Sequence, residues 1–300
     1  MPWLVPILCL LLVLGGPAGA ATGETRVLVL LSGDGRPYQQ FQTGLRESLP
    51  SRERERLDIR EHLDDLPGDE SYQLVLTVGT AALRVALENS NLPIISTLAP
   101  SSTVERLSEA HPDRAITGLY IDQPIDRHIQ LIKALFPDSS RIGHIGPDEQ
   151  APDRLIEAIE QHDVSLRHVQ ATDRRELIRI LPGMLEEVEA LLILPNALTA
   201  ESSQLRAMLL HSFRAGVPSF AYSPGLVNAG SIAAVYTEPD ALGRETADVL
   251  MEIMKLSPED WPAPKHPSTY GLATNTDVAR SLRIRLPAEE PLRQMIEQDE

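Results

Sequence analysis

Residues 72–100 read YQLVLTVGTAALRVALENSNLPIISTLAP, and this stretch specifies two strands with a helix between them. The first apolar run, Leu74–Val78, is too short for a helix and does not alternate with charged residues. That pattern is typical of a strand buried on both faces. A helical segment follows the Gly79-Thr80 turn, and a second apolar run covers residues 94–98. This order predicts a βαβ unit of a parallel sheet.

The Gly79-Thr80 turn is the first candidate site, together with residues 99–102 after the second strand. In parallel sheets, ligands bind beyond the carboxyl ends of the strands. We expect the Thr80 hydroxyl to cap the helix, and the free N–H groups behind it suit an anionic group. An ordinary helix cap explains the same residues, so the turn by itself indicates only where a site could lie.

The overall charge narrows the possible partners. The chain has 300 residues and a formal net charge of −16, with 42% hydrophobic and 23% charged residues. These proportions are those of a soluble globular protein with one large or two medium domains. The negative charge argues against nucleic acid or an anionic membrane as a partner.

The N-terminus has the pattern of a secretory signal. An apolar core over residues 4–14 precedes the small residues Ala18-Gly19-Ala20, which predicts a signal peptide over residues 1–20. A retained anchor is the alternative, although the core is short for a membrane span. Cys9, the one cysteine, lies inside this segment. We therefore expect an exported, periplasmic protein.

Strand and helix patterns alternate along the chain twice over, with a join near residue 120. The expected strands cover residues 26–31, 57–60, 74–78, 94–98, 116–121, 141–145, 165–169, 190–194, 217–222, 230–236 and 269–272. The expected helices cover residues 38–49, 81–88, 125–135, 153–162, 173–185 (broken), 202–215, 240–256 and 275–282. Residues 120–124 and 236–239 each combine a tyrosine, an acid and a proline before a helix. This weak repeat predicts two similar lobes and a hinge where the chain crosses between them.

No catalytic or metal motif stands out. The eight histidines show no metal-ligand spacing, and the chain has no His-Glu-x-x-His, nucleophile elbow, P-loop or cysteine nucleophile. Asp148 and Glu149 lie near a predicted turn, where solvated acids are the simpler interpretation. The sequence therefore predicts neither an enzyme nor a metal site.

With the lobes laid out, the chain resembles the ABC-transporter substrate-binding family that includes tryptophan- and tyrosine-type binding proteins. The resemblance covers roughly residues 25–287, and it depends on the order and spacing of several segments. These segments are residues 74–82, 92–95, 116–118, 130–133 with 137 and 140–143, 216–218 and 242–247.

The resemblance implies an α/β fold with two similar doubly wound parallel-sheet lobes joined by a hinge, the type I periplasmic-binding-protein fold. It implies ligand binding without catalysis and without a cofactor. The expected N-terminal lobe comprises residues 25–118 plus 239–262, and the C-terminal lobe residues 119–238 plus 263–287. Residues 288–300 are expected to form an acidic tail.

The family's ligand loops match residues 79–81, 97–101, 146–150, 195–196 and 223–225. The ligand-binding residues expected from these loops and from the tyrosines that could wall a ligand are Gly79, Thr80, Ala81, Thr97, Ser101, Tyr38, Tyr120, Asn196, Tyr222, Ser223 and Tyr236. The family often has an acid in three of these loops, suited to a ligand ammonium group. This chain has none there, and a buried ammonium group without a carboxylate is costly, which puts an amino-acid ligand in doubt.

Three functions remain open at this point. The first is a periplasmic protein that closes on a small organic ligand, amino-acid-like or an aromatic or carboxylate compound, and delivers it to an ABC permease. The second is a ligand-sensing or accessory module that reports to a membrane partner. The third is an exported hydrolytic enzyme acting through Asp148 or Glu149.

Overall fold

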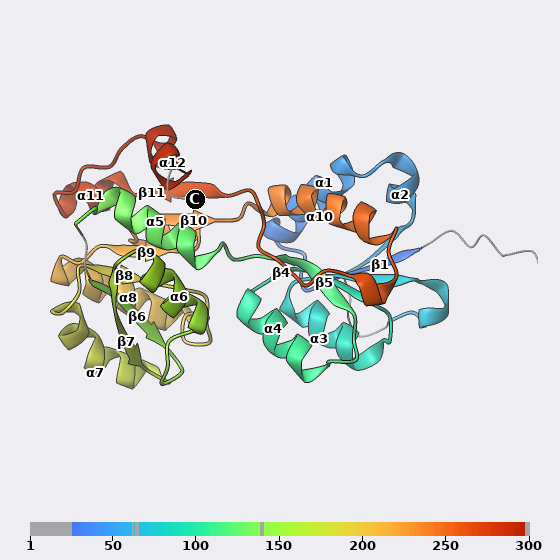
Figure 1. Ribbon diagram of the computed structural model, residues 1–300, viewed down its shortest axis with the longest axis horizontal. Coiled ribbons are helices and arrows are strands. Elements are labelled where there is room, and N and C mark those ends of the chain that lie inside the picture. Colours follow the sequence, from blue (N-terminus) through green and yellow to red (C-terminus); the bar gives the residue numbers. More distant parts are fainter. Residues whose placement is uncertain (1–25, 62, 64–65, 139–140, 298–300) are drawn as a thin grey trace, which may run out of the picture.

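The computed structural model describes residues 26–61, 63, 66–138 and 141–297. The predicted signal segment lies outside these residues. Figure 1 shows two lobes side by side, each built around its own sheet and joined by a few crossing segments. The predicted architecture of two doubly wound lobes is confirmed. Among the described helices, none combines the length and the hydrophobicity needed to cross a membrane.

The N-terminal lobe contains a parallel sheet in the order β2-β1-β3-β4-β5. Its strands are β1 (Val27–Leu31), β2 (Leu57–Arg60), β3 (Leu74–Val78), β4 (Ile94–Ala99) and β5 (Ile116–Tyr120). Its helices are α1 (Arg36–Ser48), α2 (Ser51–Glu55), α3 (Thr80–Asn89), α4 (Ser101–Ala110) and α10 (Pro239–Ile253), with 3-10 turns η1 (Asp69–Ser71) and η2 (Pro258–Asp260). The predicted lobe boundary at residue 118 falls inside β5, which continues to Tyr120.

Strand β3 shows why a continuous apolar run becomes a central strand. Leu74, Leu76 and Val78 pack into the core shared with α1 and α10, whereas Val75 points to the opposite core, against α3 and α4. Successive side chains of a strand alternate between faces, so burial on both sides requires an unbroken apolar run. Helices cover both faces of the sheet as a result.

The C-terminal lobe contains a sheet in the order β11-β10-β9-β8-β6-β7, parallel except for the β10–β11 pair. Its strands are β6 (Arg141–Gly146), β7 (Ser165–Gln170), β8 (Ala190–Leu192), β9 (Ser219–Ala221), β10 (Ala233–Tyr236) and β11 (Gly271–Thr274). Its helices are α5 (Ile125–Leu135), α6 (Asp153–Gln161), α7 (Arg174–Leu185), α8 (Ser202–Ala215), α9 (Pro224–Ala229), α11 (Thr276–Ser281) and α12 (Glu289–Glu297).

Five of the described helices differ from the sequence predictions, among them α2 and α4, which form where no helix was expected. The helix expected to be broken, α7, runs continuously through Pro182, and its N-terminus is capped by Asp173. Short helix α9 forms where only a loop was expected. Residues 289–297 of the segment expected as an acidic tail fold as α12, because Leu292 and Ile296 lie on one face and are buried in the C-terminal core.

Helices α1 and α10 pack with their backbones close together, although they lie far apart in sequence. A Cβ atom on Gly44 would lie 2.0 Å from the Asp240 carbonyl oxygen, and one on Gly243 would lie 2.2 Å from that of Phe41. Only glycine permits this approach. It brings Phe41 and Leu45 of α1 under the apolar face of α10.

Gln123 ties together the segments that cross between the lobes. Its Nε2 donates to Thr237 Oγ1 at 2.6 Å and to the Thr269 carbonyl at 3.0 Å. Its Oε1 accepts from Arg127 Nη1 at 2.5 Å. The crossings after β5, after β10 and before β11 are thereby joined by one buried side chain. This network forms the structural centre of the hinge.

Candidate functional site

In each lobe the carboxyl ends of the parallel strands point toward the other lobe. Helix α4 begins just after β4, and α6 begins a few residues after β6. These two helices contact each other across the lobes through an ion pair between Glu105 and Arg154. The candidate site is therefore assembled from turns at facing strand ends, as the sequence predicts for a parallel sheet.

The turn after β3 brings together several hydrogen-bond donors. Gly79 has φ +94°, and a Cβ atom there would lie 2.7 Å from Ser32 Oγ and 3.2 Å from the Tyr38 hydroxyl. Only glycine fits this conformation without strain. The first amides of a helix, here those of Thr80 and Ala81, have no partner within the helix. Tyr38, Gly79, Thr80 and Ala81 are thus gathered at one point.

The cap of α3 differs from the prediction. Gly79, not Thr80, is the N-cap residue, and the Thr80 hydroxyl makes no capping bond. Ser32 Oγ accepts instead from the Ala82 N–H at 2.8 Å. Ser32 follows β1 and reaches α3 because β1 and β3 are neighbours in the sheet. The capping prediction for Thr80 was therefore wrong, and its hydroxyl is left for other contacts.

The end of β4 contains a distorted backbone. Leu98 adopts φ 55°, and the β4–β5 register shifts between Ser96 and Ala99. Gly118 of β5 has φ +136°, and a Cβ atom there would lie 1.9 Å from the Ser96 carbonyl oxygen. Positive φ at a non-glycine residue costs free energy and is frequent at functional sites. The Thr97 side chain, expected to bind the ligand, is buried, and its hydroxyl lies 3.3 Å from Thr246 Oγ1 of α10.

Helix α4 was not predicted, and its N-terminus is already occupied. Asp122 accepts from the Ser101 N–H at 2.7 Å and from the Ser101 hydroxyl at 2.5 Å. The sequence signal for this helix is Pro100-Ser101-Ser102 followed by Val104 and Leu107, which are buried on one face. Because the Asp122 carboxylate caps α4, this helix end does not attract a second anion.

Tyr120 belongs to an interlobe cluster and not to the wall of an open site. The side chain is only 3% exposed, and its hydroxyl donates to Glu105 at 3.1 Å. Burial, and then the Glu105 charge, raise the pKa of Tyr120 to about 12, so it remains a donor. His266 packs edge-on against its ring at 4.9 Å.

Arg154 closes this cluster from the C-terminal lobe. Its guanidinium pairs with Glu105 of α4, and Nη1 lies 3.2 Å from His266 Nε2. His266 Nδ1 lies 2.8 Å from the Asp122 carbonyl oxygen, which can only accept. This contact places the ring proton on Nδ1 and leaves Nε2 free to accept from Arg154. The His266 ring in this arrangement therefore supports an ion pair that bridges the two lobes.

The predicted residues of the C-terminal lobe mostly support their own turns. Asn196 Oδ1 accepts from the Thr199 N–H at 3.0 Å. Ser223 Oγ caps α9 by accepting from the Leu226 N–H at 3.3 Å. Tyr222 is half-buried, and burial raises the pKa of its hydroxyl. The turns after β8 and β9 therefore present neutral polar groups, whereas the exposed acids Asp148 and Glu149 follow β6.

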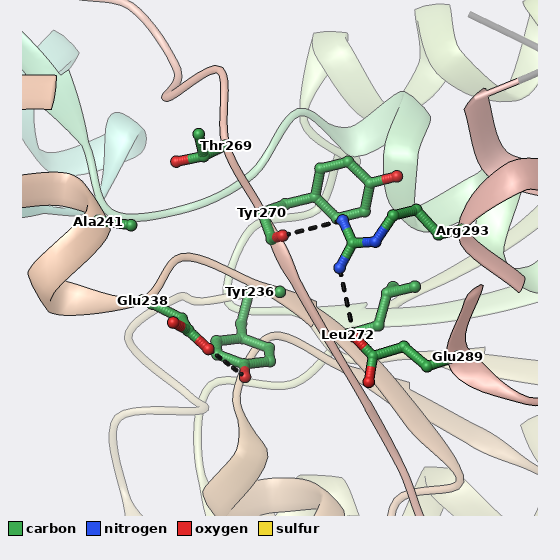
Figure 2. Close-up of a pocket in the computed structure, with 9 residues that line it drawn as sticks. Tyr236, Glu238, Ala241, Thr269, Tyr270, Leu272, Glu289 and Arg293 are labelled. Atoms are coloured by element: carbon green, nitrogen blue, oxygen red, sulfur yellow. Dashed lines mark hydrogen bonds and ion pairs between the residues drawn. The ribbon is translucent and has the colours of Figure 1, made fainter.

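Tyr236 lies elsewhere, in a cavity of about 280 Å³ at the hinge (Figure 2). The cavity is formed by the end of β10, the first turn of α10, the segment around β11 and one side of α12. Its lining residues are Tyr236, Glu238, Ala241, Thr269, Tyr270, Gly271, Leu272, Glu289 and Arg293. The structure therefore separates Tyr236 from the other predicted residues.

Two histidines are buried in neutral form. His128 lies in α5, and burial, with smaller effects from His266 and Arg127, lowers its pKa to about 4. His144 of β6 stacks on His168 with 2.9 Å between their Nδ1 atoms. Burial and then His168 lower the pKa of His144 to about 3. Within the described residues, no three His, Cys, Asp or Glu side chains are placed to share a metal ion.

The comparisons with known proteins identify the family. The model of the family described as ABC transporter substrate binding protein matches residues 62–292. The chain belongs to this family. Members bind solutes and are not enzymes. No curated protein matches the chain in sequence.

Several solved structures share the two-lobe fold of this substrate-binding protein. A ligand-free, open substrate binding protein with adhesive properties from Clostridium difficile is 16% identical, with TM-score 0.68 over 89% of this chain and 97% of that chain. An ABC domain from Streptococcus pneumoniae in complex with L-Trp is 18% identical, with TM-score 0.62 over 88% and 96%. The XylFII–LytSN complex gives 11% identity and TM-score 0.53 over 85% and 99%. At these identities the likeness shows the fold alone.

Proposed function

We propose that this protein is exported to the periplasm, closes its lobes on a small organic carboxylate and delivers it to an ABC permease. The family supports the binding role, and the signal-like N-terminus supports export. The few segments that cross between the two lobes form a hinge about which the lobes can close. In this proposal the N-terminal lobe comprises strands β1–β5 with helices α1–α4 and α10 and the turns η1 and η2, and the other described elements form the C-terminal lobe.

The observation that supports a carboxylate ligand is the turn at Gly79. The amides of Thr80 and Ala81 lie at the positive end of α3, and the Tyr38 hydroxyl lies beside them. Ser32 caps only the Ala82 amide, so among the described residues the amides of Thr80 and Ala81 remain available. A carboxylate at this turn would accept from both of them.

The same site offers little to a ligand ammonium group. Glu105 is paired with Arg154, and Asp122 is engaged at the N-terminus of α4. In the opposite lobe the turns after β8 and β9 present Asn196 and Ser223, which carry no charge, and the acids Asp148 and Glu149 after β6 are exposed to water. Desolvating an ammonium group without a carboxylate partner costs several kcal/mol, so the ligand should be a carboxylate with an uncharged remainder.

A matched set of ligands tests this proposal. Indole-3-propionate, L-tryptophan and tryptamine share a ring and differ in charge. We expect indole-3-propionate, or another carboxylate from a wider panel, to raise the melting temperature, because a ligand bound only by the native state stabilises it. It should also reduce the radius of gyration in small-angle scattering. Stabilisation by amines alone, or by no carboxylate in the panel, would contradict the proposal.

A sensory role is the second candidate. The XylFII–LytSN complex shows that a protein with this fold can form a complex with a partner. Reconstitution distinguishes the two roles. Ligand uptake into vesicles that contain a permease encoded by a neighbouring gene supports delivery. Ligand-dependent binding to a sensor domain without uptake supports sensing.

A further inference from the structure

The cavity at the hinge is separate from the strand-end site and is formed by parts of both lobes. Ala241 belongs to α10 of the N-terminal lobe, whereas Tyr236, Leu272 and Arg293 belong to β10, β11 and α12 of the C-terminal lobe. Glu238 lies on the crossing segment between them (Figure 2). A molecule in this cavity would therefore contact the lobes on both sides of the hinge.

The Tyr236 ring is accommodated by a specific feature of β11. A Cβ atom on Gly271 would lie 2.5 Å from Tyr236 Cζ and 2.9 Å from its hydroxyl oxygen. A side chain at position 271 would thus displace the ring from its place against the strand. Glycine there allows the aromatic ring to form one wall of the cavity.

The cationic residue of the cavity is already engaged. Arg293 Nη1 donates to the Tyr270 carbonyl at 3.2 Å, and Nη2 donates to Glu289 at 3.3 Å. Its guanidinium also lies 4.6 Å from the Tyr270 ring centre, and that of Arg127 lies 4.4 Å from it. Arg293 therefore balances Glu289, and the Tyr270 ring already interacts with two cations.

Glu238 and Tyr236 remain without a cation in the part of the chain that the structure describes. Glu238 accepts a hydrogen bond from the Tyr236 hydroxyl at 3.1 Å and forms no ion pair there. No guanidinium or ammonium of the described residues lies over the Tyr236 ring. The cavity thus combines one unbalanced carboxylate with one unoccupied aromatic ring.

We propose that this hinge cavity binds a small organic cation of the alkylammonium class, with its charge at Glu238 and its methyl or methylene groups on the Tyr236 ring. A carboxylate beside an aromatic face is the arrangement that recognises ammonium ligands. The volume of about 280 Å³ falls just below the usual range for drug-sized ligands, which favours a compact cation. The net charge of −16 raises the local concentration of cations.

Binding at the hinge has a consequence for the other site. Because the cavity walls belong to both lobes, a cation that fits one lobe angle better than another shifts the balance of open and closed forms. The coupling is reciprocal, so the carboxylate ligand should change the affinity for the cation by the same factor.

The test uses tetramethylammonium and choline chlorides against sodium chloride at equal ionic strength. Isothermal titration and NMR should show saturable binding of the organic cations to the wild-type protein and none of sodium. We expect Glu238→Gln to weaken binding at least tenfold, since the amide keeps the bond to Tyr236 but loses the charge. Tyr236→Leu, which removes the ring, should have a similar effect.

Glu290→Gln is the matched control, because Glu290 is an exposed acid of α12 that does not line the cavity. It should bind the cations as the wild-type protein does.

Absence of saturable binding, or equal binding by the Glu238→Gln, Tyr236→Leu and wild-type proteins, would overturn the proposal. Native-like melting of Glu238→Gln confirms folding. Titration of the carboxylate panel with this variant reports separately on the strand-end site.

Discussion

At the scale of single residues, Gly79 is the position where backbone conformation and the candidate site coincide. Its φ of +94° lies in the region that L side chains avoid, and Ser32 and Tyr38 fill the space that a Cβ atom would need. Ser32 in turn caps α3 through the Ala82 amide. Substitution at this one position therefore affects both the fold and the donors at the turn.

We expect Gly79→Ala to destabilise the protein by about 2 kcal/mol, from backbone strain and the displaced Ser32 side chain. Ligand affinity should fall with it. Gly183→Ala is the control, because a Cβ atom there meets nothing within 4 Å and alanine favours a helix by about 0.5–1 kcal/mol. Urea unfolding and calorimetric titration measure both effects. A Gly79→Ala protein as stable as wild type would contradict this reading of the turn.

Sequence reasoning found this turn but not the contacts that complete it. Gly79 follows an apolar strand, which marks the turn in the sequence alone. The partners Ser32 and Ala82 are separated by 50 residues, and Ser101 and Asp122 by 21. Such pairs depend on strand order and on the exact end of each helix, which hydrophobic patterns do not specify.

At the scale of elements, α4 and α6 bridge the lobes through Glu105 and Arg154. The two side chains are 35% and 49% exposed, so water and salt screen the ion pair. Surface pairs of this kind contribute about 0.2–1 kcal/mol. The free energy of this ion pair stabilises the arrangement in which the two lobes are in contact, because Glu105 and Arg154 belong to different lobes.

We therefore expect Arg154→Ala to weaken ligand binding by a factor of about 1.5–5, corresponding to those energies. The effect should shrink as salt concentration rises. Arg167→Ala removes a comparably exposed pair, with Glu187, inside the C-terminal lobe and serves as the control. Titration at low and high salt, with scattering of the free protein, measures the change. Equal effects of the two substitutions would exclude a role in closure.

The elements that sequence reasoning identified are those with a strong hydrophobic period. Continuous apolar runs revealed the central strands, and helical spacing revealed α5 and α8. Helix α2 was missed because it has five residues and none of them is buried. Helices α4, α9 and α12 were missed because they begin at proline- or acid-rich segments typical of loops. Their apolar faces are short and become recognisable only beside the core that they cover.

At the scale of the whole molecule, stability should depend on pH through His128 and His144. Burial holds their pKa values at about 4 and about 3 in the folded protein, below the ordinary value near 6.5. Between these values the unfolded chain binds more protons than the folded one. Folding stability is therefore complete above about pH 6.5 and decreases as the pH falls toward 4.

We expect a loss of up to about 1.4 kcal/mol per pH unit for each histidine over this range. Urea unfolding at pH 7, 6 and 5 measures the slope. His144→Gln and His128→Gln should each flatten it relative to the wild-type protein. A slope that stays the same in both buried-site variants would show that other groups control the acid sensitivity.

The two lobes and their crossings were predictable because tyrosine, acid and proline recur at residues 120–124 and 236–239. The hinge cavity was not, because α12 forms one of its sides and was taken for a tail. The Gln123 network was also hidden, since its partners lie 114 and 146 residues away.

The pairing of α1 with α10 has a consequence for biosynthesis. The first lobe lacks one of its covering helices until Pro239 and the residues after it have been translated, when most of the second sheet already exists. Until then Phe41 and Leu45 have no cover from α10, and the nascent chain cannot complete its first core. A chain ordered in this way completes its first core only late in synthesis, which would favour the proposed export, since a translocation channel accepts unfolded chains.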